Sequence, residues 1–299
     1  MFVVSIFGGL GSQMDQYSFL LALKKAYPDT IVKIEINNLF EPQHNGFELK
    51  RVFGINEPEA SIAEVELLSE FCPRTTNHFK IKQYLYKLRR LMVGQKESWI
   101  YPEDPTAFYP QVFALNPFKN YIFFGNWGNE RYRVDVEQEI KNTFHFQDFN
   151  NSRNSSIAHD ILSSNSVSIH VRHGDYVTIG YSVLPMSYYR EAIKIVKGKI
   201  DSPRFFIFSD DTEFIKSEFD FLDNKVIVDW NKGDDSFRDM QLMSLCKHNI
   251  IANSTFSYWG ARLNYYEQSI KIAPKYHVPI CKHFIGEGND KWLLIDNQK

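Results

Sequence analysis

Long hydrophobic runs, paired cysteines and an excess of charge are all missing from this 299-residue chain. No apolar run approaches 18 residues, so we expect no membrane-spanning helix. The three cysteines, Cys72, Cys246 and Cys281, lie far apart and form no CxxC pair, which argues against a disulfide framework or a structural zinc site. The first residues lack the basic segment and small-residue cleavage site of a signal peptide. We therefore expect a cytoplasmic protein.

Composition and charge exclude further classes of protein. The net charge of −2 gives no electrostatic case for nucleic-acid binding. The chain is 43% hydrophobic and 15% aromatic, which is typical of a folded globular protein rather than a disordered one. Its length is enough for two domains of ordinary size.

Hydrophobic patterning predicts alternating strands and helices in both halves of the chain. Strand 2–7, a glycine turn, helix 12–27 and strand 30–36 form a βαβ unit, the building block of a parallel sheet. The polar segment 148–157 is the best candidate for a linker. We therefore predict two α/β domains, residues 1–155 and 156–299. The other predicted elements are helices 59–71 and 79–93 and strand 119–125, then strands 166–171, 204–209, 225–229, 248–252 and 269–273 with helices 186–198, 212–218, 236–246 and 257–267.

The glycine turn "FGGLGSQMDQ" (7–16) lies between a predicted strand and a predicted helix. Glycines there let backbone N–H groups and the helix N-terminus approach an anion, although a tight turn that packs helix on strand explains them equally. Glu35 ends the next strand, where a dinucleotide fold places a ribose-binding acid. However, Met14 occupies the third glycine position of GxGxxG, so the pattern of a nicotinamide oxidoreductase is broken.

Polar residues follow successive strands of the second half. Arg172 in "HVRHGDY" (170–176) offers a rigid fork of donors that suits phosphate oxygens. Asp210 and Asp211 follow strand 204–209, and residues 253–257 follow strand 248–252. Structural alternatives exist for each group: an Arg–Asp ion pair, an aspartate that caps a helix, and a hydroxyl N-cap. A carboxylate pair also suits a metal, but no third ligand is apparent nearby. Taken together, the three groups favour a phosphate-bearing ligand at one edge of a parallel sheet.

Several blocks of the sequence resemble bacterial α-1,2-fucosyltransferases of glycosyltransferase family 11. They are "GGLGSQMDQYSFLLALK", "HNGFELKRVFGI" (44–55), "GNWGNERY" (125–132), "HVRHGDY", "FSDD" and "DMQLMSLCKHNIIANSTFSYWGARLN", in the family's order and across nearly the whole chain. The resemblance implies a GT-B-like fold of two Rossmann-like domains that face each other across a cleft. It also implies an N-terminal acceptor-side domain, a C-terminal GDP-sugar-binding domain and no metal. The implied reaction moves L-fucose from GDP-β-L-fucose, with inversion, to the 2-hydroxyl of galactose in a surface glycan such as O-antigen. The acceptor would be a galactose-containing oligosaccharide, lipid-linked in that setting.

Site residues follow from the resemblance position by position. Arg172 resembles the arginine that binds the donor β-phosphate, and His170 and Asp175 belong to the same motif. The other implied donor-binding residues are Ser209, Asp210 and Asp211 near the guanine and ribose, Asn253, Ser254, Thr255, Phe256 and Ser257 in the loop that cradles the diphosphate, and Gly9, Gly11 and Gln13 in the N-terminal loop. Glu48, His44 and Asp15 are the candidates for a general base, while His44 and Glu48 also suit a structural pair.

The chain departs from the family pattern at three positions within these motifs. The family usually reads HxRRGDY and GGLGNQMFQ, whereas this chain has His173, Ser12 and Asp15. His173 replaces a permanent cation with a group that titrates near neutrality. The changes raise the hypothesis of a variant GDP-6-deoxy-L-hexose donor such as GDP-colitose. A weakened fucosyltransferase is an alternative within the family, and a non-catalytic nucleotide-sugar binder or an NAD-dependent oxidoreductase is the alternative from another class.

A further segment, "FKIKQYLYKLRRLM" (79–92), combines apolar and basic residues at helical spacing. Packing of its apolar stripe on the protein core, with a solvated basic face, is one interpretation. The other is peripheral contact with the anionic inner membrane, where a lipid-linked acceptor would be found.

Overall fold

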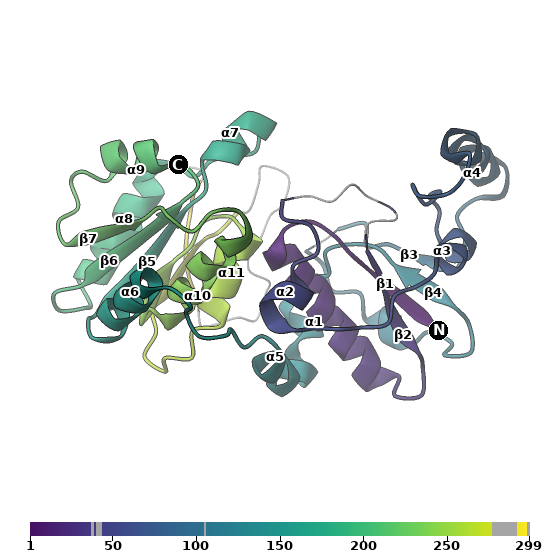
Figure 1. Cartoon of the computed structure of the whole chain (residues 1–299), viewed down its shortest axis with the longest axis horizontal. Coiled ribbons are helices and arrows are strands. Elements are labelled where there is room, and N and C mark those ends of the chain that lie inside the picture. Colours follow the sequence, from purple (N-terminus) through teal and green to yellow (C-terminus); the bar gives the residue numbers. More distant parts are fainter. Residues whose placement is uncertain (37–38, 40–43, 105, 277–291, 298–299) are drawn as a thin grey trace. The chain divides into compact units, whose positions relative to one another are not determined.

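The computed structural model describes residues 1–36, 39, 44–104, 106–276 and 292–297 (Figure 1). The side chains of Asp175, Thr178 and Ile179 also lie outside the described part, as does Cys281. The chain divides into two compact units, Met1–His145 and Phe146–Lys299, which are called unit 1 and unit 2 below. Each is an α/β unit built on a parallel sheet, which confirms the predicted fold class.

Unit 1 is built on a parallel sheet with the strand order β2-β1-β4-β3. Strand β1 pairs with both neighbours, so that Val4 lies opposite Ile34 on β2 and Phe123 on β4. All five residues of β1 are buried, as expected for a strand that is covered on both faces. The elements are β1 (Phe2–Ile6), α1 (Leu10–Ala26), β2 (Val32–Ile36), α2 (Leu49–Phe53), α3 (Ile62–Leu68), α4 (Phe79–Val93), β3 (Trp99–Ile100), η1 (Pro110–Phe113), β4 (Tyr121–Phe123), η2 (Glu130–Tyr132), η3 (Val134–Val136) and α5 (Glu137–Thr143).

The glycine turn joins β1 directly to α1. Gly8 has a φ of 79°, in the left-handed region that favours glycine, and Gly9 is the N-cap of the helix. The helix then lies along one face of the sheet (Figure 1) and is buried over most of its length. The predicted βαβ unit is therefore confirmed.

Unit 2 contains a wider parallel sheet with the strand order β10-β9-β8-β5-β6-β7. The central strand β5 pairs with β6 and β8, and all six of its residues are buried. The elements are α6 (Ser152–Leu162), β5 (Ser166–Val171), α7 (Gly174–Ile179), α8 (Met186–Lys197), β6 (Arg204–Ser209), α9 (Thr212–Glu218), β7 (Lys225–Val228), η4 (Gly233–Asp235), α10 (Phe237–Leu245), β8 (His248–Ile250), α11 (Thr255–Arg262), β9 (Lys271–Pro274) and β10 (Trp292–Ile295).

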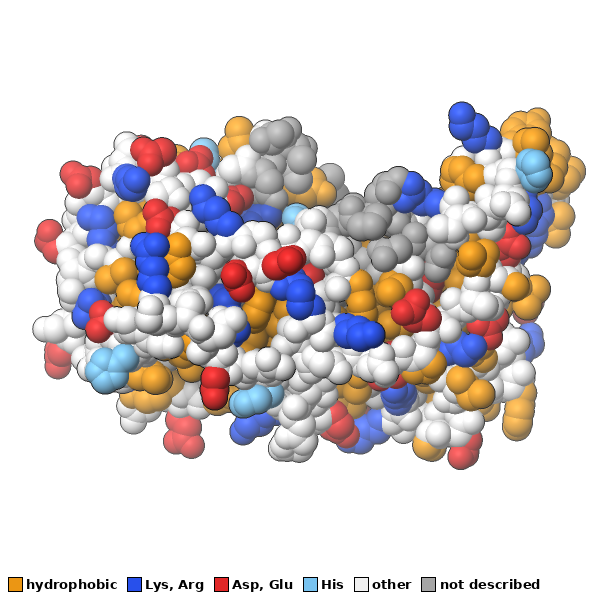
Figure 2. Space-filling view, viewed as in Figure 1, with side chains coloured by type: hydrophobic (Ala, Val, Ile, Leu, Met, Phe, Trp, Pro, Cys, Tyr) orange, Lys and Arg blue, Asp and Glu red, His pale blue; other side chains and the backbone are white. Residues whose placement is uncertain are grey.

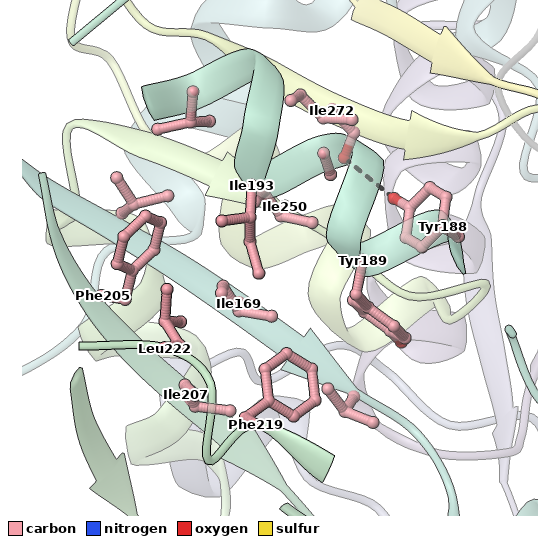
Figure 3. Close-up of a cluster of buried hydrophobic side chains, with 14 of the residues drawn as sticks. Ile169, Tyr188, Tyr189, Ile193, Phe205, Ile207, Phe219, Leu222, Ile250 and Ile272 are labelled. Atoms are coloured by element: carbon pink, nitrogen blue, oxygen red, sulfur yellow. Dashed lines mark hydrogen bonds between the residues drawn. The ribbon is translucent and has the colours of Figure 1, made fainter. Parts of the chain in front are cut away.

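The core of unit 2 fixes the position of these strands (Figure 3). Ile169, Ile207 and Ile250 from three neighbouring strands pack against α8, which contributes Tyr188 and Tyr189. The Tyr188 hydroxyl donates to the carbonyl of Ile251 at 2.7 Å. Truncation of one such isoleucine to alanine typically costs about 2–5 kcal/mol, so the strand ends are held firmly.

The segment expected to be a loosely structured linker is in part a helix, so that prediction is wrong. The units divide between His145 and Phe146, ten residues before the expected boundary, and α6 already begins at Ser152. Asn151 caps α6 by accepting a hydrogen bond from the N–H of Asn154 at 2.8 Å. The Asn154 side chain is itself buried and bonds to Asn231 at 2.9 Å, a distant contact that composition alone does not reveal.

Candidate functional site

The polar residues that follow β5, β6 and β8 are brought to the same edge of the unit 2 sheet. Parallel pairing places Val171 opposite Ser209 and Ile169 opposite Ile250, so the three strands end side by side. The segments that start at Arg172, Asp210 and Ile251 therefore leave the sheet at its carboxyl edge. The grouping predicted from the sequence is confirmed, and it is where ligands bind in sheets of this kind.

Arg172 is held at this edge by Asp210. Its Nε lies 3.5 Å from Oδ2 of the carboxylate, while Oδ1 accepts the backbone N–H groups of His173 at 3.0 Å and Gly174 at 3.2 Å. The guanidinium carbon lies 5.6 Å from the centre of the Tyr176 ring. About a fifth of the Arg172 side chain stays exposed, so the fork is positioned and still accessible to an anion.

His173 faces the protein rather than serving as a second exposed cation. Its Nδ1 lies 2.8 Å from Oδ2 of Asp211, and its ring stacks on Phe214 with 3.9 Å between the ring centres. Asp211 also caps α9 by accepting the N–H of Phe214 at 3.0 Å. This backbone bond, followed by the bond to His173, holds the pKa of Asp211 below its usual range. Both carboxylates that follow β6 are therefore engaged in positioning the chain.

The loop after β8 leads into α11, whose N-cap is Ser254 in extended conformation without a side-chain capping bond. The Asn253 carbonyl accepts the Tyr176 hydroxyl at 3.0 Å, and the Asn253 amide donates to the Ser182 carbonyl at 2.8 Å. Ser257 donates to the Ser254 carbonyl at 3.2 Å. The Ser257 hydroxyl thus bonds within the loop, and the first turn of α11 supplies backbone N–H groups that suit an anion.

His170 lies beneath this edge as a buried, neutral imidazole. Burial, followed by the charge of Arg172, lowers the pKa of His170 far below its usual range. Its ring lies 5.8 Å from the Phe256 ring, and its Nδ1 has no hydrogen-bond partner among the described residues. Asp175 of the same motif lies in α7, and its side chain is outside the described part.

In unit 1, Gln13 ties the glycine turn to the segment around Glu48. Its amide donates to the carbonyls of Gly8 at 2.8 Å and Gly46 at 2.7 Å, and its Oε1 accepts the Glu48 N–H at 2.9 Å. The side chain is almost fully buried. Gln13 therefore shapes the loop, and Gly9 and Gly11 lie at the start of the helix that it braces.

His44 and Glu48 lie beside this loop. The exposed His44 ring packs against Gly9, where an added Cβ would come within 3.0 Å of the ring. Glu48 is buried and accepts hydrogen bonds from Arg51 at 2.8 Å and Asn45 at 3.3 Å. Burial is the main cause that raises the pKa of Glu48, against the lowering effects of Asn45, Arg51 and His44. An accessible imidazole thus lies within electrostatic reach of a carboxylate of raised proton affinity.

Asp15, the third candidate for a general base, is a structural residue. Its carboxylate is buried against the guanidinium of Arg133, which also donates to the Gly128 carbonyl at 2.9 Å. A buried carboxylate that is paired with arginine cannot readily accept a proton from a substrate. The interpretation of Asp15 as a base is therefore wrong.

The residues that suggested a dinucleotide site also have structural roles. Glu35 is buried and accepts the backbone N–H of Leu39 at 3.2 Å. Met14 is fully buried in the face of α1 that packs on the sheet. The acid that a nicotinamide enzyme would use for the ribose is therefore not presented to a ligand.

Sequence reasoning missed a row of stacked aromatic rings at the carboxyl edge of the unit 1 sheet. Phe7, Phe124 and Tyr101 follow β1, β4 and β3, which are neighbours in the sheet. Phe124 stacks on Phe7 at 4.9 Å and on Tyr101 at 5.9 Å between ring centres, and half of Tyr101 is exposed. Phe7 ends one predicted strand and Phe124 lies one residue before the end of another, whereas the two-residue β3 gave no signal for Tyr101.

Asp239 in α10 is a second residue that the sequence did not single out. Its Oδ1 accepts a hydrogen bond from Asn231, which follows β7, at 2.8 Å. Burial, against the effect of that hydrogen bond, raises the pKa of Asp239 to about 7. A carboxyl group that titrates near neutrality therefore lies close to the end of β7. Among the residues that the structure describes, no group of three or more His, Cys, Asp or Glu is arranged to hold a metal ion.

Comparison with known proteins identifies the family to which the chain is similar. The sequence profile of "Glycosyl transferase family 11" matches residues 92–283, more than half of the chain. An alpha-1,2-colitosyltransferase of Escherichia coli is 29% identical over 295 residues, covering 91% of this chain and 90% of that protein. The O-antigen biosynthesis glycosyltransferase WbnK of Escherichia coli is 38% identical over 45% of this chain and 44% of its own length. The galactoside 2-alpha-L-fucosyltransferase SEC1 of Bos taurus is 26% identical over 88% of this chain and 64% of its own length.

Proposed function

The chain belongs to glycosyl transferase family 11, and we propose that it transfers a 6-deoxy-L-hexose from a GDP-sugar to the 2-hydroxyl of a galactose in a bacterial surface glycan. L-Fucose is the first candidate for the sugar, because several matched relatives are named as galactoside 2-fucosyltransferases. Colitose is the second, because the relative that matches over 91% of the chain is named as a colitosyltransferase.

The donor half of the proposal rests on the carboxyl edge of the unit 2 sheet. Arg172 is positioned by Asp210 and stays partly exposed, close to the loop that begins α11 through Tyr176. A guanidinium beside a helix N-terminus is a strong site for a diphosphate. Both groups also stabilise the negative charge that grows on GDP as the sugar–phosphate bond breaks. Asp210, Asp211 and His173 act as positioning residues in this account.

The acceptor half rests on unit 1. The acceptor oxygen attacks C1 of the sugar from the face opposite GDP, the C1–O bond to phosphate breaks, and one displacement inverts the anomeric centre. We infer that the hydroxyl proton goes to the exposed imidazole of His44, which lies near enough to Glu48 for the two groups to interact electrostatically. The half-exposed ring of Tyr101, which is stacked on Phe124, offers an apolar surface against which a sugar ring could pack. Lipid linkage of the acceptor, a cytoplasmic location and independence from metal complete the proposal.

Removal of the imidazole tests the proposed base. His44→Ala should lower kcat by about 100-fold or more, the usual contribution of a general base, and should leave the donor KM unchanged. The dependence of kcat on the protonation of the base should disappear in the variant. Unchanged kcat in His44→Ala would reject His44 as the base and leave the donor site unaffected.

A comparison of two donors tests the choice of sugar. Colitose lacks a hydroxyl group that fucose carries, and a site built to hydrogen-bond a hydroxyl rejects the analogue that lacks it by about 10⁴-fold or more in kcat/KM. If fucose is the natural sugar, GDP-fucose should therefore exceed GDP-colitose by that order. A ratio well below one would favour colitose, and a ratio near one would show that the site does not recognise this hydroxyl.

Thermal unfolding with added nucleotides tests the site without any turnover. A ligand that binds only the folded state stabilises it by mass action and therefore raises Tm. At a ligand concentration of a hundred times Kd, the stabilisation is about 2.7 kcal/mol. GDP should raise the Tm, whereas UDP and NAD should not. A shift with NAD and none with GDP would overturn the proposed function in favour of a nicotinamide enzyme.

A further inference from the structure

Helix α4 stands apart from every other helix of unit 1 because none of its residues is buried. The residues that are partly buried, Phe79, Lys82, Tyr86 and Arg89, recur at intervals of three or four and therefore form one face. That face holds the helix to the segment around α3: Lys82 pairs with Glu66 at 2.7 Å, and Arg89 pairs with Glu70 at 3.2 Å. The contact between α4 and the rest of unit 1 is therefore largely polar.

The apolar side of α4 points away from that contact. Its residues follow the helical spacing i, i+3, i+4, i+7, which places them in one stripe. They are Ile81, Tyr84, Leu85, Leu88, Leu91 and Met92, all of which are exposed, with Leu91 at 76% and Met92 at 70%. Packing of this stripe on the core, one of the two interpretations offered by the sequence, is therefore wrong. Soluble helices normally turn the apolar stripe inward, and α4 does the reverse.

The surroundings of the stripe are strongly basic. The segment 71–96 contains seven Lys and Arg and no Asp or Glu, in a chain whose net charge is −2. Lys80 and Lys87 are exposed and border the stripe along one side, and Arg89 and Lys82 border it along the other. Figure 2 shows hydrophobic side chains gathered with Lys and Arg over α4.

We propose that α4 is a membrane-binding helix that lies in the headgroup region of an anionic phospholipid bilayer with its apolar stripe buried. A bilayer surface satisfies both parts of the pattern, since it takes up apolar side chains along a line and attracts the cations beside them. A second copy of this chain is disfavoured, because pairing two such faces would bring two basic segments together. A nucleic acid would leave the central Leu and Met stripe without a partner. The helix has 15 residues and lies on the bilayer rather than across it, and no described helix is long and apolar enough to cross a membrane.

Vesicle co-sedimentation of the full chain tests the proposal, because it needs neither donor nor acceptor. Vesicles of equal parts phosphatidylglycerol and phosphatidylcholine should bind the protein, and vesicles of phosphatidylcholine alone should bind it far more weakly. Binding should weaken steeply at about 1 M salt, where the Debye length falls to about 3 Å. Each lysine near an anionic surface contributes about fivefold to partitioning, so Lys80→Gln with Lys87→Gln should weaken binding about 25-fold.

Two further variants distinguish binding by the stripe from non-specific adsorption of the protein to vesicles. Leu91→Ser with Met92→Ser should weaken binding about tenfold or more, because both side chains would enter the bilayer. Phe118→Ser removes another exposed apolar side chain of unit 1, and Lys197→Gln with Lys199→Gln removes two exposed lysines of unit 2; neither control should change binding. All the replaced side chains are exposed, so the unfolding midpoints should match that of the parent protein.

Three results would overturn the proposal. The first is no binding to anionic vesicles, and the second is binding that the α4 variants leave unchanged. The third is concentration-dependent dimerisation in light scattering that Leu91→Ser abolishes, which would assign the stripe to a second copy. A Tm shift with GDP is independent of all three, so failure here and failure of the proposed function remain distinguishable.

Discussion

Replacement of Arg172 by alanine should separate activity from stability. The side chains of Arg172 and Asp210 are 21% and 24% exposed, and their closest approach is 3.5 Å. An ion pair of this kind contributes about 1 kcal/mol at most to folding. Asp210 keeps its bonds to the N–H groups of His173 and Gly174 in the variant, so the strand end should keep its shape.

The expected loss of activity is much larger than the loss of stability. Removal of one donor that stabilises developing charge typically costs about 100- to 1000-fold in kcat, equivalent to about 2.7–4 kcal/mol. The Tm shift caused by GDP should shrink for the same reason, because Arg172 is proposed to contact the diphosphate. Initial rates of transfer and urea unfolding of Arg172→Ala measure the two quantities independently.

Arg204 provides a matched control at the opposite edge of the same sheet. It begins β6 and pairs with Asp160 at 2.8 Å, with both side chains about one third exposed. Arg204→Ala should cost as little stability as Arg172→Ala and leave kcat unchanged. The reasoning fails if Arg172→Ala keeps kcat within tenfold of the parent protein, or if both variants lose activity in proportion to their loss of stability.

Other substitutions test the remaining parts of the account. Gly9→Ala should lower kcat with little change in Tm, because the Gly9 backbone is compatible with alanine while the new Cβ would lie 3.0 Å from the His44 ring; unchanged turnover would count against the role of His44. Asp15→Asn should cost up to about 3 kcal/mol in urea unfolding, because the buried Arg133 loses its nearer carboxylate and keeps only Glu130 at 3.5 Å, and a loss below about 1 kcal/mol would contradict the structural role. Asp239 has its pKa raised to about 7, so the folded state holds more protons than the unfolded state between about pH 4 and 7. The stability of the parent protein relative to Asp239→Asn should therefore fall as pH rises through this window and level off above it, and a parallel pH dependence of the two proteins would refute the assignment.

Elements with strong periodicity were predictable from the sequence alone. Strand β5 and helix α9 begin and end where their patterns predict, because a continuous apolar run or a capped amphipathic turn is a local signal. Strand β3 was not predictable, since its two residues are defined by pairing with β4. Helix α6 was missed for a similar reason, because its polar sequence is stabilised by the distant Asn231 and Trp230 through Asn154.

The candidate site was also predictable only where the signal is local or follows from the topology. Parallel topology alone predicts that Arg172, Asp210 and the α11 loop meet at one edge, and they do. The use of each side chain depends on partners far away in the chain, which the sequence does not reveal. Asp15 is paired with Arg133, 118 residues away, and its acidity gave the wrong expectation of a base. The facing of the two units across a cleft stays a prediction from the family resemblance.

Product analysis of a single transfer reaction tests the central claim most directly. The protein would be incubated with GDP-β-L-fucose or GDP-colitose and a galactose-terminated oligosaccharide, and the product linkage would be determined by NMR. The account predicts a new α-linked 6-deoxy-L-hexose on the galactose 2-hydroxyl, with release of GDP and inversion at C1. Transfer to another hydroxyl, retention of the β configuration, or binding of GDP without any transfer from either donor would contradict it.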